Sequence, residues 1–153
     1  MKYVVALLTV ALLTFSSVDA RADGPSKGLG VGIETGEVLG AMAFYMISPM
    51  IQIGSGVGLQ IKENSNVFYL SPQVRFLFNV GLAVTYMYLD AQFRLLFGDS
   101  SASALVFRLG LLHWVSQAFA VYGGVSMLEL GFDPSSTTLG ILSAFVGAQF
   151  MLN

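Results

Sequence analysis

The chain has 153 residues, of which 55% are hydrophobic and 10% are charged, with a mean hydropathy of +0.73 and a net charge of -2. Soluble domains carry roughly 25% charged residues, so much of this surface is expected to meet lipid or another protein. The small net charge and the lack of a basic block give no electrostatic basis for binding nucleic acid. The absence of cysteine excludes disulfides, thiolate metal sites, cysteine nucleophiles and attachment through a lipidated cysteine.

The first 20 residues have the features of an export signal. Lys2 supplies the positive end, an apolar run extends over Val4–Phe15, and small residues precede a cleavage point after Ala20. An uncleaved membrane anchor is the alternative, but it needs about 20 apolar residues and this run is shorter. We therefore expect a cleaved signal peptide, a short polar lead over 21–27 and one domain over 28–153.

Apolar and polar residues alternate along Met50–Lys62 with the period of two that is typical of a β-strand. Val67–Phe78 alternates as clearly, with apolar residues such as Phe68 at even positions and polar residues such as Arg75 at odd positions. Such strands present an apolar face on one side and a polar face on the other. Together with the export signal, they predict a barrel with lipid outside and a polar lumen inside.

Turn signals divide the chain into eight apolar segments that we predict to be strands. The predicted strands are Gly28–Thr35, Val38–Ile47, Met50–Lys62, Val67–Phe78, Val80–Phe97, Ser103–Val115, Ala118–Leu130 and Leu139–Leu152. Tight turns are expected at Ser48-Pro49, Asn79 and Ser116-Gln117, and longer polar loops at 62–66, 98–102 and 131–137. An even number of strands joined alternately by short turns and longer loops is typical of an outer-membrane barrel.

Val80–Phe97 is the least regular of the predicted strands. Its second half alternates cleanly, whereas Val80, Leu82 and Val84 place apolar residues on the parity that is polar later. A β-bulge near Tyr86–Tyr88 would restore the register. A pair of strands in this segment is the alternative, and it would change the total number.

The interior of an eight-stranded barrel is just wide enough for side chains to fill, so we expect a packed core and no water channel. Charged residues on the inward faces would be costly if unpaired, but they could form an ion-pair network. The candidate members are Glu34, Lys62, Arg75, Asp90, Arg94, Arg108 and Glu129. Inward glycines such as Gly30, Gly110 and Gly147 would make room for them. A structural role is the simpler interpretation, and a ligand or gating site is the alternative.

His113 is the single histidine, which rules out a multi-histidine metal site and leaves one candidate general base. A membrane acyl hydrolase would need a nucleophile beside it, but Ser116 is expected in the following turn and has the opposite strand parity. We instead expect His113, Trp114 and Tyr122 to be amphipathic residues at the membrane interface, where aromatic girdles lie. The sequence contains no complete nucleotide-binding or metal motif, so it predicts no catalytic residue, cofactor or metal.

Several segments carry a resemblance to a known family. They are the signal segment, the opening GLGVGIETGEVLG, the strand SPQVRFLF, the run LHWVSQAFAVYGGVSM and the final strand LGILSAFVGAQFML. With these segments the chain resembles the small outer-membrane β-barrel proteins of Gram-negative bacteria, which include the eight-stranded OmpA-like and OmpX-like barrels. Members usually end on an aromatic residue, whereas this chain keeps Phe150 and Leu152 at that spacing and adds Asn153. The resemblance implies insertion into the cell outer membrane by the assembly machinery, and it implies no active-site residue.

Two other architectures remain open at this point. Val38–Ile61 and Leu109–Leu128 are uncharged and long enough to cross a bilayer as helices, as in a small inner-membrane protein. Against helices, the first contains Pro49 and several glycines, and charged residues such as Arg75 and Asp90 interrupt the apolar stretch between them. A secreted soluble β-protein is the other alternative.

We therefore expect an all-β, antiparallel up-and-down transmembrane barrel of about eight strands. Its expected role is structural or interactive, with the lipid bilayer as its partner and the lumen filled by side chains. A lipid-modifying barrel enzyme that uses His113 is the alternative function.

Overall fold

The computed structural model of the chain describes residues 27–36, 39–62, 65–82, 84–98, 102–132 and 135–152. The side chains of residues 60–62, 65, 66 and 135–142 are outside this description. The expected signal peptide over residues 1–20 and most of the expected polar lead also lie outside the described residues.

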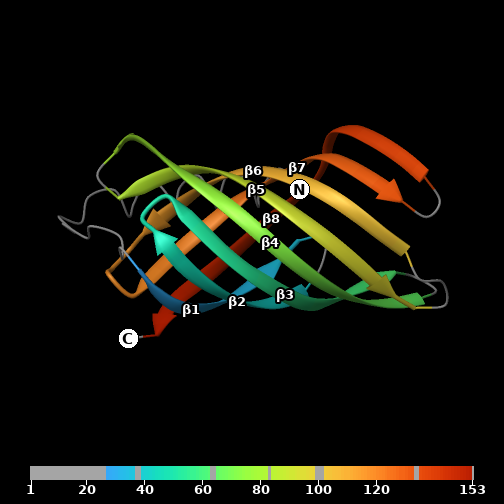
Figure 1. Ribbon diagram of the computed structural model, residues 1–153, viewed down its shortest axis with the longest axis horizontal. Helices are drawn as coiled ribbons and strands as arrows, with labels where there is room; N and C mark the ends of the chain where they lie inside the picture. Colours follow the sequence, from blue (N-terminus) through green and yellow to red (C-terminus); the bar gives the residue numbers. More distant parts are fainter. Residues whose placement is uncertain are drawn as a thin grey trace, which may run out of the picture.

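Eight antiparallel strands form a closed barrel in which each strand pairs with the next and the last pairs with the first (Figure 1). The strands are β1 (Gly28–Thr35), β2 (Leu39–Ser48), β3 (Ile51–Lys62), β4 (Ser65–Leu82), β5 (Thr85–Phe97), β6 (Ala102–Trp114), β7 (Phe119–Phe132) and β8 (Ser135–Leu152). The described residues are all-β, which confirms the predicted barrel and its strand count. The helical alternative is wrong for this part of the chain.

In the described part of the chain no helix has the length and apolar character needed to cross a membrane.

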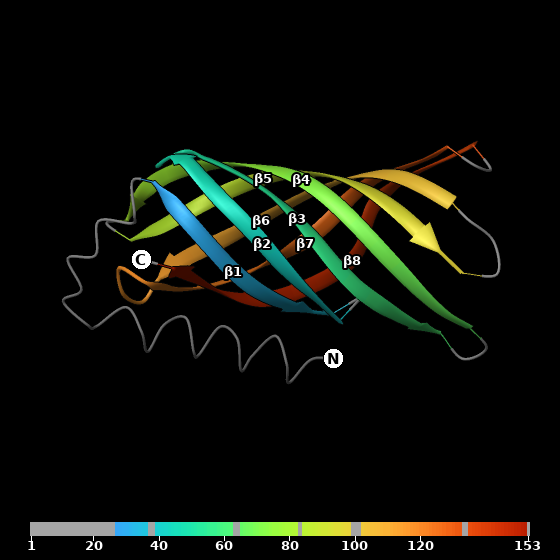
Figure 2. The same cartoon turned by 60° about the horizontal axis from the view of Figure 1, so that its bottom comes forward.

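The connections between the strands lie at the two ends of the barrel. At one end, called the turn end, lie the start of β1, the end of β8 and the tight turns that follow β2, β4 and β6 (Figures 1 and 2). Ser48 Oγ accepts the N–H of Met50 at 3.2 Å, and Ser116 Oγ accepts the N–H of Phe119 at 3.1 Å. These side-chain bonds stabilise two of the tight turns, because they satisfy backbone donors that the strand pairing leaves free. The opposite end is called the loop end.

The third tight turn lies further along the chain than predicted. β4 continues through Leu82, so Val80 and Leu82 keep the even-numbered, outward parity of that strand and are exposed. The register irregularity lies between Asn79 and Leu82, where Asn79 Oδ1 accepts the N–H of Gly81 at 2.7 Å. Gly81 has a φ of 83°, a left-handed conformation that favours glycine. The prediction of a turn at Asn79 and a bulge near residues 86–88 is therefore wrong.

Two of the expected long loops are mostly strand. Strand pairing continues to Lys62 opposite Ser65 and to Phe132 opposite Ser135. Hairpins at the loop end therefore extend further than predicted, and the connections at 63–64 and 133–134 are short. The sequence suggested loops because Ser, Thr and Asn favour turns, but strand pairing can include such residues at the end of a hairpin.

The faces of the strands follow the predicted alternation. In β1, Gly30, Gly32 and Glu34 are buried while Leu29 and Ile33 are exposed. The same division holds in β3 and β4, so polar residues point into the barrel there. Toward the turn end the interior is instead filled by an apolar plug, which consists of Met42, Phe44, Met46, Leu77, Tyr88, Leu112, Trp114, Ala120, Tyr122, Phe145 and Met151.

Candidate functional site

The middle of the barrel holds a row of opposite charges. Asp90 of β5 lies directly opposite Arg75 of β4 on one side and Arg108 of β6 on the other. Arg75 Nη2 donates to Asp90 Oδ2 at 3.1 Å, and Arg108 Nη2 donates to the same oxygen at 2.5 Å. All three side chains are at most 1% exposed, so water screens these interactions little.

Glu34 closes the arrangement from the opposite wall. It belongs to β1, and its Oε1 accepts a hydrogen bond from Arg108 Nη1 at 2.6 Å across the lumen. Its Oε2 lies 3.3 Å from the hydroxyl of Tyr122, which donates to it. The four groups Glu34, Arg75, Asp90 and Arg108, called the charge cluster, contain two carboxylates and two guanidinium groups. The charges within the cluster therefore balance, which is the condition under which buried ions are tolerated.

Amide side chains extend the hydrogen bonding around the arginines. Gln149 Oε1 accepts from Arg75 Nη1, and Gln73 Oε1 accepts from Arg108 Nη2, both at 3.5 Å. The amides of Gln73 and Gln92 are 2.6 Å apart, and turning the Gln92 amide brings its oxygen against the Arg108 guanidinium. These neutral groups supply further acceptors without disturbing the charge balance.

Aromatic rings cover the guanidinium groups. The Cζ of Arg75 lies 4.4 Å from the ring centre of Tyr88 and 4.7 Å from that of Tyr122, and the Cζ of Arg108 lies 4.1 Å from the ring centre of Phe145. Such cation–π contacts strengthen when the cation is removed from water. The rings thus link the charge cluster to the apolar plug.

Glycines on neighbouring strands make room for these rings. A Cβ at Gly110 would overlap the ring of Tyr88, and one at Gly147 would overlap the ring of Tyr122. Gly30 stands in the same relation to Phe44. The inward glycines expected from the sequence therefore accommodate long side chains, and the side chains concerned include aromatic rings.

A cavity of about 10 Å³ adjoins the charge cluster, lined by residues that include Glu34, Met42, Ser71 and Gln73. This volume is about that of one water-sized sphere. The small cavity and the apolar plug show that side chains fill the described interior around the charge cluster.

We accordingly expect no ion conduction. Purified protein added to a planar lipid bilayer should give a current indistinguishable from that of the empty membrane, because ions would have to displace both the charge cluster and the plug. Reproducible single-channel steps from the wild-type chain would contradict a closed lumen.

The other expected members of the network lie in different positions. Arg94 is buried on β5, with its Nε 3.3 Å from the Gln92 amide. Glu129 of β7 is half-buried, and no ion pair joins it to another described residue. The backbone of Lys62 ends β3, and its side chain lies outside the described residues. Of the six candidates whose side chains are described, the structure therefore brings four together in the charge cluster.

The expected interface positions of Trp114 and Tyr122 are not what the structure shows. Trp114 is 1% exposed and Tyr122 is 4% exposed, and both belong to the apolar plug. Both fall on the inward parity of their strands, as Arg108 does on β6. The prediction relied on residue type, although parity carried the signal that places them inside.

His113 lies beside a threonine instead of the candidate nucleophile. Its Nδ1 is 2.8 Å from Thr85 Oγ1, whereas Ser116 Oγ is occupied in the turn by backbone N–H groups. Among the residues that the structure describes, no three His, Asp or Glu side chains are grouped to hold a metal ion. Among the described residues, the histidine thus has a hydroxyl partner and no hydrogen-bonded carboxylate of the kind that orients a catalytic base.

Comparison of the chain with protein-family models and with curated proteins finds no match. What the charge cluster can do chemically follows from its geometry. Buried, balanced and hydrogen-bonded, it ties four strands, β1, β4, β5 and β6, together through the lumen.

Proposed function

We propose that this chain is an integral outer-membrane β-barrel protein with a structural or interaction role. The observation that carries the proposal is the separation of charge from the outer surface. Of the charged side chains that the structure describes, those of Glu34, Arg75, Asp90, Arg94 and Arg108 are buried in the barrel, Glu129 is half-buried, and only Lys27, outside the strands, is exposed. A barrel in water has no physical reason to keep its outer face free of charge.

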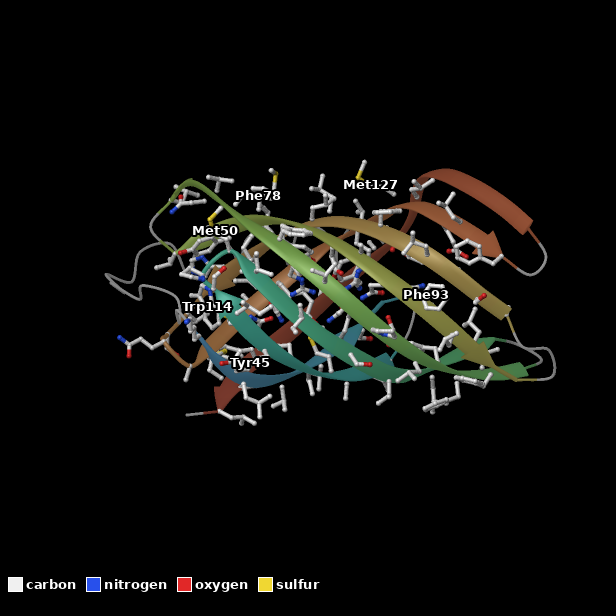
Figure 3. All side chains as sticks on the ribbon, viewed as in Figure 1. Tyr45, Met50, Phe78, Phe93, Trp114 and Met127 are labelled. Carbon is white, nitrogen blue, oxygen red and sulfur yellow. The ribbon has the colours of Figure 1, made fainter. Side chains whose placement is uncertain are left out.

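The outer face is instead a continuous apolar surface, called the outer belt. Figure 3 shows Phe78 and Met127 projecting away from the ribbon, and both are 41% exposed. Exposed large apolar side chains occur on every strand, and examples are Ile33, Leu39, Ile53, Val57, Leu59, Phe68, Phe76, Leu89, Phe93, Leu111, Met127 and Leu152. An exposed apolar surface of this extent supports contact with hydrocarbon.

Aromatic side chains form two rows at the margins of the outer belt. Toward the loop end lie Phe68, Phe93, Phe97 and Phe132, with ring centres 6.2 Å apart for Phe68 and Phe97 and 6.0 Å apart for Phe93 and Phe132. Toward the turn end lie Tyr45, Phe78, Phe119 and Phe150, and the rings of Phe119 and Phe150 are 4.7 Å apart. Aromatic girdles of this kind flank the lipid-facing band of outer-membrane barrels.

The separation of the two rows fits a bilayer. Phe68 and Phe78 lie ten residues apart on β4. At about 3.4 Å per residue and a strand tilt of about 40°, this corresponds to a height of roughly 26 Å. The apolar band of outer-membrane barrels is about 25 Å tall.

Export and insertion belong to the same proposal. The signal-like segment 1–20 would direct the chain across the inner membrane, and the assembly machinery of the outer membrane would insert the barrel. The resemblance of the sequence to OmpA-like and OmpX-like barrels supports this route, as does the observed eight-stranded topology. The filled lumen supports a structural or interaction role over transport.

Fractionation of Gram-negative cells that express the full chain tests the location. We expect the protein in the outer-membrane fraction, with gel migration that changes when the sample is heated, because a closed barrel resists unfolding by detergent at room temperature. Recovery in the inner membrane or in the soluble periplasmic fraction, without a heat-dependent change, would refute the proposal.

A further inference from the structure

A hollow of about 340 Å³ interrupts the outer belt over β6, β7 and β8. At its centre is Gly123, which lies opposite Leu111 on β6 and Val146 on β8. Val121, Val125 and Ala144 complete the outward-facing lining. The lining is apolar, and the volume of the hollow lies in the range of pockets that hold small ligands.

The packing of the barrel does not require the hollow. Gly124 points inward, where a Cβ would overlap the carbonyl of Leu109 and press against the ring of Phe145. At Gly123 the nearest atoms to a Cβ would be Phe145 O at 3.3 Å and Val146 Cγ1 at 3.6 Å, so a side chain there needs only small adjustments. The missing side chain thus leaves space on the outer surface that the interior does not use.

A polar residue outside the lining, His113, lies next to the hollow on its turn-end side. His113 is the cross-strand neighbour of Val121, and it is 8% exposed although it has outward parity. Thr85 occupies its Nδ1 at 2.8 Å, and Nε2 has no hydrogen-bond partner among the described residues. This ring nitrogen is therefore available to a hydrogen-bonding group from another molecule.

We propose that the hollow binds one acyl chain of a phospholipid, with an ester or headgroup oxygen of that lipid bonded to His113 Nε2. The inference rests on the proposed membrane location, because it takes its ligand from the leaflet at the turn end. Val121 is two residues from Phe119 of the turn-end aromatic row, which puts His113 near the depth where lipid ester groups begin. The hollow then extends from this level toward the middle of the outer belt, as an acyl chain does.

Native mass spectrometry tests the site. The protein is first reconstituted in vesicles of phosphatidylethanolamine and phosphatidylglycerol and then extracted in a mild detergent. We expect the wild type to retain one phospholipid. Ala144→Leu fills the hollow without changing the backbone, and it should reduce the retained fraction at least fivefold. His113→Phe keeps a ring but removes the bond to the lipid oxygen, and it should also reduce retention. The matched control is Ala41→Leu on the exposed face of β2, which should retain lipid as the wild type does.

Flotation with the vesicles is measured first, because it tests the proposed membrane location separately from the proposed lipid site. If the wild type fails to float, the proposed membrane location fails and the lipid site fails with it. If all variants float and retain the same amount of lipid, only the lipid site is refuted. A dimer that Ala144→Leu dissociates would show that a second copy occupies the hollow, which would also refute the lipid site.

Discussion

Asp90→Asn is expected to lower the free energy of unfolding by about 3–5 kcal/mol, since breaking a buried ion pair leaves uncompensated charge. Asparagine keeps the shape of the side chain but removes the negative charge that Arg75 and Arg108 share. Two buried guanidinium groups would then face the single carboxylate of Glu34. Urea unfolding of the barrel in detergent micelles or vesicles, followed by tryptophan fluorescence from Trp114, measures the loss.

The chain offers a matched control and a rescue for this substitution. Glu129→Gln removes a half-buried carboxylate that has no ion pair with another described residue, and it should cost less than about 1 kcal/mol. Adding Arg75→Gln to Asp90→Asn restores the charge balance, so the double variant should be more stable than Asp90→Asn alone. Equal losses in the free energy of unfolding for Asp90→Asn and Glu129→Gln would show that the charge cluster stabilises the barrel no more than a single half-buried carboxylate does.

Gly110→Ala is expected to destabilise the barrel by about 3 kcal/mol or more, at the upper end of the cost of overpacking. A methyl group at this position would overlap both the ring of Tyr88 and the carbonyl of Gly123 on the neighbouring strand. The ring cannot move away easily because it also lies against the Arg75 guanidinium. The fraction of refolded protein, read from heat-dependent gel migration across a urea series, measures the effect.

A neighbouring glycine provides the control. Gly123→Ala places its methyl group on the outer face, where the nearest atom is 3.3 Å away, and it should cost less than about 1 kcal/mol. Tyr88→Leu removes the ring and should relieve part of the cost of Gly110→Ala. If Gly110→Ala is as stable as Gly123→Ala, the close packing of rings on glycines is not a constraint on this barrel.

Strand faces could be predicted from the sequence wherever the two sides of a strand differ in chemistry. In β1, β3 and β4, polar residues and glycines alternate with aliphatic or aromatic ones, so parity alone identifies the inward face. The position of the β4–β5 turn was missed because the outward alternation of β4 continues past Asn79 through Leu82. If the alternation of inward and outward residues is followed past Asn79, it predicts the turn after Leu82.

The part of the apolar plug that β2 supplies could not be predicted in the same way. In β2 the inward Phe44 and Met46 and the outward Tyr45 and Ile47 are all apolar, so alternation does not separate them. The pairing of Glu34 with Arg108 is likewise absent from the sequence, because the two residues lie 74 positions apart. Their contact depends on how the closed barrel brings β1 opposite β6, and on the exact register between successive strands.

Maleimide labelling of single cysteines tests most directly the central claim that the outer belt lies in lipid and the charges lie inside. The chain has no cysteine, so each introduced thiol reports alone. Leu89→Cys places a thiol in the outer belt, next in sequence to the buried Asp90, and Lys27→Cys places one at an exposed site outside the strands. In fragmented outer membranes, a water-soluble maleimide should label Lys27→Cys rapidly and Leu89→Cys only after unfolding. Equally rapid labelling of both cysteines in the folded protein would show that the belt faces water and would contradict this account.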